Sequence, residues 1–154
     1  MKLRFGLSLA FLLALTTGPL VAADGALIAK IAFEFVPNTS LIVLPVTIND
    51  HGPFRFLLDT GASHTILTSV AADSLGLPTG RPWRMMTAGG DVPADIRMLQ
   101  TFKVGDAHWD NVEIVVMNAD LMRALHFDGI LGGDYLRRFK LSIDYANRVV
   151  DITA

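Results

Sequence analysis

The sequence predicts a single, mostly β domain with a barrel-like arrangement of strands and one or two short helices. Short segments rich in β-branched and aliphatic residues follow one another along the chain, and turn-forming residues separate them at close intervals. No linker, repeat or low-complexity tract interrupts residues 24–154, so we expect one domain there. With 154 residues, 51% of them hydrophobic, the chain is long enough to bury one sizeable core.

Residues 1–23 are typical of a secretory signal peptide. Two basic residues precede an apolar stretch over residues 5–15, and small residues at 21–23 are suited to cleavage. The apolar stretch is about half of the roughly 20 residues that a membrane-spanning helix needs. We therefore expect residues 24–154 to be exported, either to the periplasm or out of the cell, with no stable membrane association after cleavage. The alternative is that an uncleaved N-terminal segment anchors the protein.

The first half of the domain predicts three strands and a helix. Residues 27–36 alternate loosely, residues 41–48 are β-branched and aliphatic, and residues 53–58 are largely apolar. A Pro-Asn pair and an Asn-Asp-His-Gly turn separate these strands. A helix is predicted over residues 68–75, because a Thr-Ser pair can cap its N-terminus and Gly76 ends it.

The second half of the domain alternates β-rich segments with short helical ones, and its strands end at turn-forming Gly, Asp or Asn residues. In chain order the predicted elements are two strands within 82–102 around a Gly89-Gly90 turn, a strand over 108–117, a helical turn over 120–126, a short helix over 134–139, and a hairpin of 141–144 with 149–152.

Composition excludes several kinds of chemistry. The chain has no cysteine, which rules out disulfides, thiolate-bound zinc, iron–sulfur clusters and thiol nucleophiles. Removal of residues 1–23 leaves 11 basic and 15 acidic residues, so the domain offers no basic surface for nucleic acid or for anionic lipid headgroups. The four histidines show no metal-ligand spacing. We therefore expect no nucleic-acid partner, no metal and no cofactor, and any chemistry should rest on carboxylates or other oxygen groups.

An Asp-Thr-Gly motif is the strongest candidate for a chemical role. The apolar strand that ends at Leu58 runs directly into Asp59, Thr60 and Gly61. This order delivers a carboxylate from a buried strand to the start of a tight loop, where the glycine allows its backbone N–H to approach closely. The alternative is a purely structural role, because many Asp-x-Gly sequences only hold their own turn.

The wider sequence resembles that of retropepsin-like aspartic proteases, in particular their bacterial secreted members. Residues 59–63 (Asp-Thr-Gly-Ala-Ser) are similar to the active-site loop of that family, and residues 129–136 are similar to its later glycine element. Two such motifs about 70 residues apart are far more specific than one. The resemblance implies a closed barrel, in which Ile130, Leu131 and Gly132 pack behind the loop and lead into a short helix.

In that family two carboxylates face each other around one water molecule and share a proton, because two like charges that close cannot both ionise. This chain has one Asp-Thr-Gly and no second Asp-Thr-Gly or Asp-Ser-Gly, and we expect Asp134 to cap a helix rather than to supply the second acid. The resemblance therefore implies a two-fold symmetric homodimer in which each copy contributes Asp59 as catalytic carboxylate. The implied activity is endopeptidase cleavage of a polypeptide by an activated water.

The resemblance also implies roles for the other loop residues. Thr60 is similar to the residue whose hydroxyl bonds across the dimer axis, and Gly61 is similar to the residue whose N–H steadies the carboxylate. Ala62 replaces the hydroxyl residue of pepsin-like loops, so one donor to the ionised carboxylate is missing and we expect a pH optimum closer to neutral than that of pepsin. Ser63 occupies a position where viral members often carry Asp. His64 directly follows the loop, and one reading is that it tunes the electrostatic field at the loop. The alternative is a histidine with a structural or solvated role only.

Residues 82–102 occupy the place of the family's flap, the hairpin that closes over a bound peptide. Trp83, Met85 and Met86 offer adaptable apolar contacts to a polypeptide substrate. The tip would be formed by Thr87, Ala88, Gly89 and Gly90. The alternative is an ordinary surface hairpin. At the level of function, the alternative to an endopeptidase is a non-catalytic peptide-binding module that keeps the fold, and a third reading is an enzyme that processes one precursor only.

Overall fold

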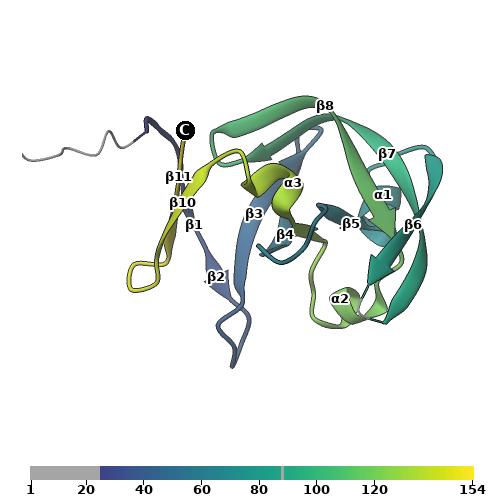
Figure 1. Cartoon of the computed structure of the whole chain (residues 1–154), viewed down its shortest axis with the longest axis horizontal. Coiled ribbons are helices and arrows are strands. Elements are labelled where there is room, and N and C mark those ends of the chain that lie inside the picture. The colour runs from purple at the N-terminus through teal and green to yellow at the C-terminus, as the bar shows by residue number, and fades with distance from the viewer. Residues whose placement is uncertain (1–24, 88) are drawn as a thin grey trace, which may run out of the picture.

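The structure is a computed structural model that describes residues 25–87 and 89–154. The expected signal segment at 1–23 lies outside the described residues, and so does Ala88. Eleven strands and three helices occur in the described part of the chain (Figure 1), which confirms the prediction of a mostly β domain. No helix in this part is long and apolar enough to cross a membrane.

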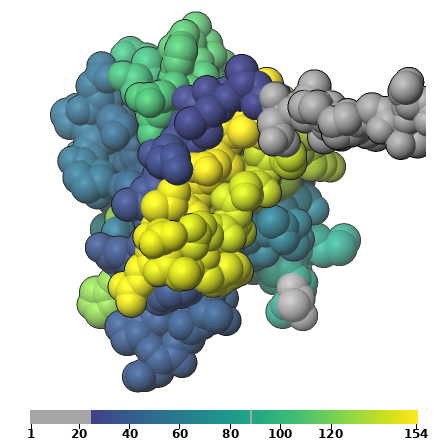
Figure 2. All heavy atoms as spheres, turned by 90° about the vertical axis from the view of Figure 1, so that its left-hand side faces the viewer, coloured from purple at the N-terminus to yellow at the C-terminus, as the bar shows by residue number. Residues whose placement is uncertain are grey.

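The strands form two sheets. The smaller sheet joins the two ends of the described chain in the order β1-β11-β10, with the bounds Leu27–Ala32 for β1, Val149–Thr153 for β11 and Lys140–Asp144 for β10. Figure 2 shows the N-terminal strand, in purple, lying against the C-terminal hairpin, in yellow. All pairs in this sheet are antiparallel, so the predicted C-terminal hairpin is confirmed.

The larger sheet has eight strands in the order β2-β3-β4-β9-β5-β8-β7-β6. The bounds are Glu34–Phe35 for β2, Ile42–Ile48 for β3, His51–Leu58 for β4, Gly129–Leu131 for β9, Ile66–Thr68 for β5, Ala107–Met117 for β8, Gly90–Val104 for β7 and Arg81–Thr87 for β6. An additional pairing of β3 with β7 closes the six strands from β3 to β7 into a ring. The predicted closed barrel is therefore confirmed, and β6 extends beyond it as an edge strand.

The core fills this ring with large apolar side chains. Phe56 on β4 and Phe102 on β7 are fully buried, and their rings meet edge to face with centroids 5.7 Å apart. Tyr135 packs on the Phe102 ring at 4.8 Å and on the Trp109 ring at 5.0 Å. These contacts join β4, β7, β8 and helix α3 (Gly133–Leu136) in one aromatic cluster, and aromatic rings supply large apolar areas in a few side chains.

Three helices are present where one or two were expected: α1 (Ser69–Ser74), α2 (Asp120–Ala124) and α3 (Gly133–Leu136). The predicted start of α1 is confirmed, since Thr68 accepts the Ala71 N–H at 3.3 Å as its N-cap. Gly76 follows the helix with a φ of +63°, a left-handed conformation that glycine adopts without strain.

Several predicted boundaries differ from the structure. The single strand expected over residues 27–36 is divided between the two sheets, because the chain leaves β11 at Phe33 and then pairs with β3. The second turn is confined to Asn49 and Asp50, which have positive φ values, so β4 begins at His51 instead of residue 53. The sequence did not predict β5, since a strand of three residues is too short to show an alternating pattern.

Candidate active site

Asp59 lies at the exit of a strand that is paired on both sides. Strand β4 runs antiparallel to β3 and parallel to β9, where Leu58 is opposite Leu131. The Asp59 N–H donates to the Leu131 carbonyl at 3.1 Å, so the ladder extends one residue beyond β4. The barrel therefore holds the backbone of Asp59, while the side chain is half-buried at the edge of a cavity.

The loop folds back on the Asp59 carboxylate. The Gly61 N–H donates to Asp59 Oδ1 at 2.8 Å, and the Ala62 N–H donates to the Asp59 carbonyl at 3.3 Å. A Cβ on Gly61 would lie 3.2 Å from the same Oδ1, so glycine gives the carboxylate its closest approach to the backbone. Thr60 is exposed at the turn of the loop, and no described residue hydrogen-bonds its hydroxyl; Ser63 is also exposed.

The element formed by Ile130, Leu131 and Gly132 lies directly behind this loop. Ile130 is paired with both β4 and β5, which places β9 between the strands that enter and leave the loop. A Cβ on Gly132 would collide with the backbone carbonyl of His64, so only glycine allows this approach. The next N–H, that of Gly133, donates to the Ala62 carbonyl at 2.8 Å and fixes the far side of the loop.

A contact between the buried Thr65 and the half-buried Asp134, which the sequence did not predict, ties the loop to α3. The Thr65 hydroxyl donates to Asp134 Oδ1 at 2.6 Å, and the Thr65 N–H donates to Oδ2 at 2.9 Å. The Gly132 N–H in turn donates to the Thr65 hydroxyl at 3.0 Å. Asp134 is therefore not the helix cap that was expected, because Gly132 occupies the N-cap position and Asp134 lies in the first turn. No local sequence pattern marks this pair, whose members are 69 residues apart.

Tyr135 follows Asp134 and is the one group near the loop with a marked shift in acidity. Its phenol is buried, which raises its pKa well above the usual value, and the negative charge of Asp134 adds to the effect. Tyr135 therefore remains neutral and serves as packing for the aromatic cluster.

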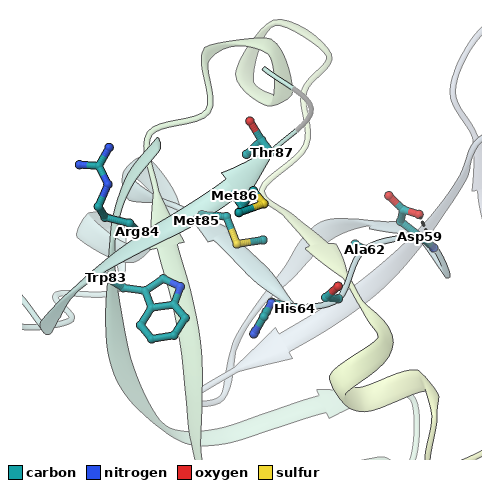
Figure 3. A pocket seen from close by; sticks show the side chains of 10 residues that line it. Asp59, Ala62, His64, Trp83, Arg84, Met85, Met86 and Thr87 are labelled. Carbon is teal, nitrogen blue, oxygen red and sulfur yellow. Dashed lines mark hydrogen bonds between the residues drawn. The ribbon is translucent and has the colours of Figure 1, made fainter. Parts of the chain in front are cut away.

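A cavity of about 770 Å³ opens in front of the loop. One wall consists of Asp59 and residues 61–64, and the other consists of residues 83–87 of β6. In Figure 3 the side chains of Trp83 and Met85 project from β6 toward the loop, with the His64 ring near the Trp83 ring (centroids 6.4 Å apart). Asp59 is the single acidic residue of the described chain that borders this cavity.

The hairpin of β6 and β7 forms the outer wall, in the place expected for a flap. Its strands pair from Arg81 with Ile96 to Thr87 with Gly90. Thr87 borders the cavity and closes the tip, since its hydroxyl donates to the Gly90 carbonyl at 2.8 Å and accepts the Gly89 N–H at 3.2 Å. Gly89 and Gly90 do not border the cavity, and Ala88 lies outside the described residues.

Of the wall residues, Arg84 was not indicated by the sequence, whereas His64 was expected next to the loop, with either a structural role or a role in tuning its field. Arg84 borders the cavity and forms a 3.6 Å ion pair with Asp91 across the hairpin. His64 borders the main cavity and a second one of about 270 Å³ on the other side of Trp83. Within residues 25–87 and 89–154, no group of three or more His, Asp or Glu side chains is arranged to hold a metal ion.

Two known structures support the same architecture. A retropepsin-like aspartic protease from Rickettsia conorii is similar with a TM-score of 0.54 and 22% identity, over 80% of this chain and 86% of that chain. The retroviral protease-like domain of Ddi1 from Leishmania major is similar with a TM-score of 0.53 and 18% identity, over 75% of this chain and 94% of that chain. The protease of EIAV, solved with an inhibitor, has a TM-score of 0.49 and 26% identity over 68% and 92% of the two chains.

Comparison with sequences assigns the family. No curated protein matches the chain. The family described as aspartyl protease matches residues 44–135, which is more than half of the chain and runs from β3 through α3. That range contains the loop with Asp59, the β6/β7 hairpin and the glycine element behind the loop. The chain therefore belongs to the aspartyl protease family, and its fold is retropepsin-like.

Proposed function

We propose that the protein is an aspartic endopeptidase whose active site is completed by a second copy of the chain. The observation that carries the proposal is that Asp59 alone among the described acidic residues borders the cavity, held at its rim by the Gly61 N–H. An aspartic mechanism needs two carboxylates, and the sequence has a single Asp-Thr-Gly. A two-fold symmetric homodimer would bring the Asp59 of the partner to the first.

In this dimer the two Asp59 carboxylates share one proton. The ionised carboxylate removes a proton from the water as the water oxygen attacks the peptide carbonyl, and the protonated one donates its proton to the carbonyl oxygen. Collapse of the tetrahedral intermediate breaks the C–N bond. The amine leaves with the proton that the first carboxylate took from the water, and the second carboxylate takes back a hydroxyl proton as the new carboxyl group forms. The exposed Thr60 hydroxyl, which has no partner among the described residues, is available to bond across the dimer axis.

The substrate would be an extended polypeptide lying between the loop and β6. Strand β6 is the edge strand of its sheet, so its outer backbone groups are free to pair with a peptide as an added strand. Trp83, Met85 and Met86 supply apolar surface to the substrate, and thioether side chains adapt to irregular shapes.

The proposal is tested with Asp59→Asn, which keeps the size of the side chain and removes its charge. The variant should fold and dimerise as the wild type does and lose cleavage of a peptide library. A subunit-mixing assay then tests the shared dyad. Addition of an equal amount of D59N to a fixed amount of wild type should reduce activity to about half, because hybrid dimers hold one carboxylate only.

Each outcome decides between the readings. Unchanged activity in the mixture would show that each chain works alone, and a strictly monomeric active protein would overturn the dimer. Peptide binding without cleavage by the wild type would favour the non-catalytic binding module, and cleavage of a single exported precursor would favour a processing enzyme.

We further propose that residues 24–154 act outside the cytoplasm, after removal of the signal peptide. This proposal rests on the charge and apolar pattern of residues 1–23. N-terminal sequencing of the exported protein should begin at or near Asp24. A protein that begins at Met1 and sediments with membranes would instead support the anchor.

A further inference from the structure

Arg97 on β7 is the one buried charged side chain in the described part of the protein, with 9% of its side chain exposed. Its Nε donates to Asp95 Oδ1 at 2.7 Å and its Nη2 donates to Asp95 Oδ2 at 3.3 Å, which is a bidentate pair. Its Nη1 donates to the Leu77 carbonyl at 3.1 Å and lies 3.5 Å from Asp73 Oδ1. One guanidinium thus holds the end of α1, the connector after it and strand β7.

This cluster lies at the base of the β6/β7 hairpin. The connector over residues 77–80 leads into β6, and the Gly80 N–H donates to Asp95 Oδ1 at 3.3 Å. The ladder of β7 with β8 ends where Ala94 meets Met117. From Pro93 to the tip, β7 is paired with β6 alone. Arg97 is therefore placed just before the point at which the hairpin leaves the barrel.

We infer that Arg97 is a positioning residue for the cavity, because its bonds to Asp95 and to the 77–80 connector fix the direction in which the β6/β7 hairpin projects over Asp59. The inference rests on the proposed function insofar as the hairpin is expected to hold substrate. Residues 83–87, which form the outer wall of the cavity, lie on the projecting part. A change of angle at the base displaces them most, since displacement grows with distance from the pivot.

The burial of Arg97 makes this arrangement rigid. A guanidinium with little access to water has no alternative partners, so a rotation of the connector would leave a buried charge without its hydrogen bonds. Gly80 adds to the restriction, because it lies so close to the Ile96 carbonyl that a Cβ would collide with it. The hairpin base thus has one well-determined position.

The test compares Arg97→Met with Arg97→Lys, Asp95→Asn and the control Lys103→Met. Lys103 lies on the same strand and also pairs with an aspartate, Asp50 at 2.6 Å, but at the opposite end of β7. Hydrogen exchange of residues 82–93 is compared with exchange of the barrel strands, and KM and kcat are measured on a cleaved peptide. Equilibrium unfolding in urea reports the global stability of each variant.

In R97M the exchange of residues 82–93 should rise about tenfold relative to the barrel, and KM should rise by about the same factor while kcat stays within about threefold. In R97K the rises in hydrogen exchange and in KM should be smaller than in R97M, since an ammonium group reaches Asp95 but cannot form the bidentate pair. In K103M the hydrogen exchange of residues 82–93 and KM should both stay at the wild-type level.

Three results would overturn the inference: a folded R97M with wild-type exchange in the hairpin, a similar increase in K103M, or exchange that rises equally in the barrel. If R97M does not fold, hydrogen exchange of the hairpin and of the barrel is compared in D95N instead, where Arg97 is kept and its bidentate partner is changed. A wild-type protein that cleaves nothing would refute the proposed function alone, because hydrogen exchange still decides whether Arg97 positions the hairpin.

Discussion

Thr65→Val tests the hydrogen-bond network that supports the candidate active-site loop. Valine keeps the shape of the fully buried Thr65 side chain and removes its hydroxyl. The change deletes the 2.6 Å bond to the Asp134 carboxylate and leaves the buried Gly132 N–H without an acceptor. A charge-assisted bond contributes about 1.5–3 kcal/mol, and an orphaned buried N–H costs about 1–3 kcal/mol. The free energy of unfolding should therefore fall by about 3–5 kcal/mol.

Thr68→Val is the matched control, because it makes the same chemical change three residues later. Thr68 is also buried, but its hydroxyl only accepts the Ala71 N–H at 3.3 Å as the cap of α1. Loss of such a cap costs about 1 kcal/mol. Urea unfolding, followed by fluorescence and circular dichroism, gives the free energy of unfolding of both variants, and an unchanged m-value shows that the two curves can be compared. A loss of stability in T65V equal to or smaller than that in T68V would refute the reasoning.

Two further predictions concern pH. The Arg97 guanidinium beside Asp95 holds the pKa of that carboxyl below its usual value of 3.8, so the stabilisation is present above this pH and is lost as the pH falls through the lower folded-state pKa. Urea midpoints should therefore decline more steeply below about pH 4 in wild type than in Asp95→Asn, and parallel curves would contradict this. Ala62→Ser should move the acidic limb of kcat/KM to lower pH by about one unit, because the added hydroxyl would stabilise the ionised form of the proposed Asp59 dyad; an unmoved limb in an active variant would count against it.

The features predicted well from sequence are those that depend on neighbouring residues. The cap at Thr68 and the end of α1 at Gly76 follow from the conformational preferences of single residues. The approach of the Gly61 N–H to Asp59 joins residues two positions apart, so local backbone geometry is sufficient for it. Features without such a local signal were missed, as with the three-residue strand β5 and the division of residues 27–36 between two sheets.

Sequence alone determined that an apolar strand ends in a carboxylate on a glycine loop, and that a second glycine element lies further along the chain. Both patterns consist of consecutive residues, so no tertiary contact is needed to recognise them. Tertiary structure decided what surrounds that carboxylate. The Thr65–Asp134 contact joins residues 69 apart, and β6 supplies the wall opposite Asp59. The first contact depends on the pairing of β5 with β9, and the second depends on the pairings that join β5 to β6 through β8 and β7. These pairings join segments far apart in the chain, and the packing of a whole core, which no local pattern encodes, determines them.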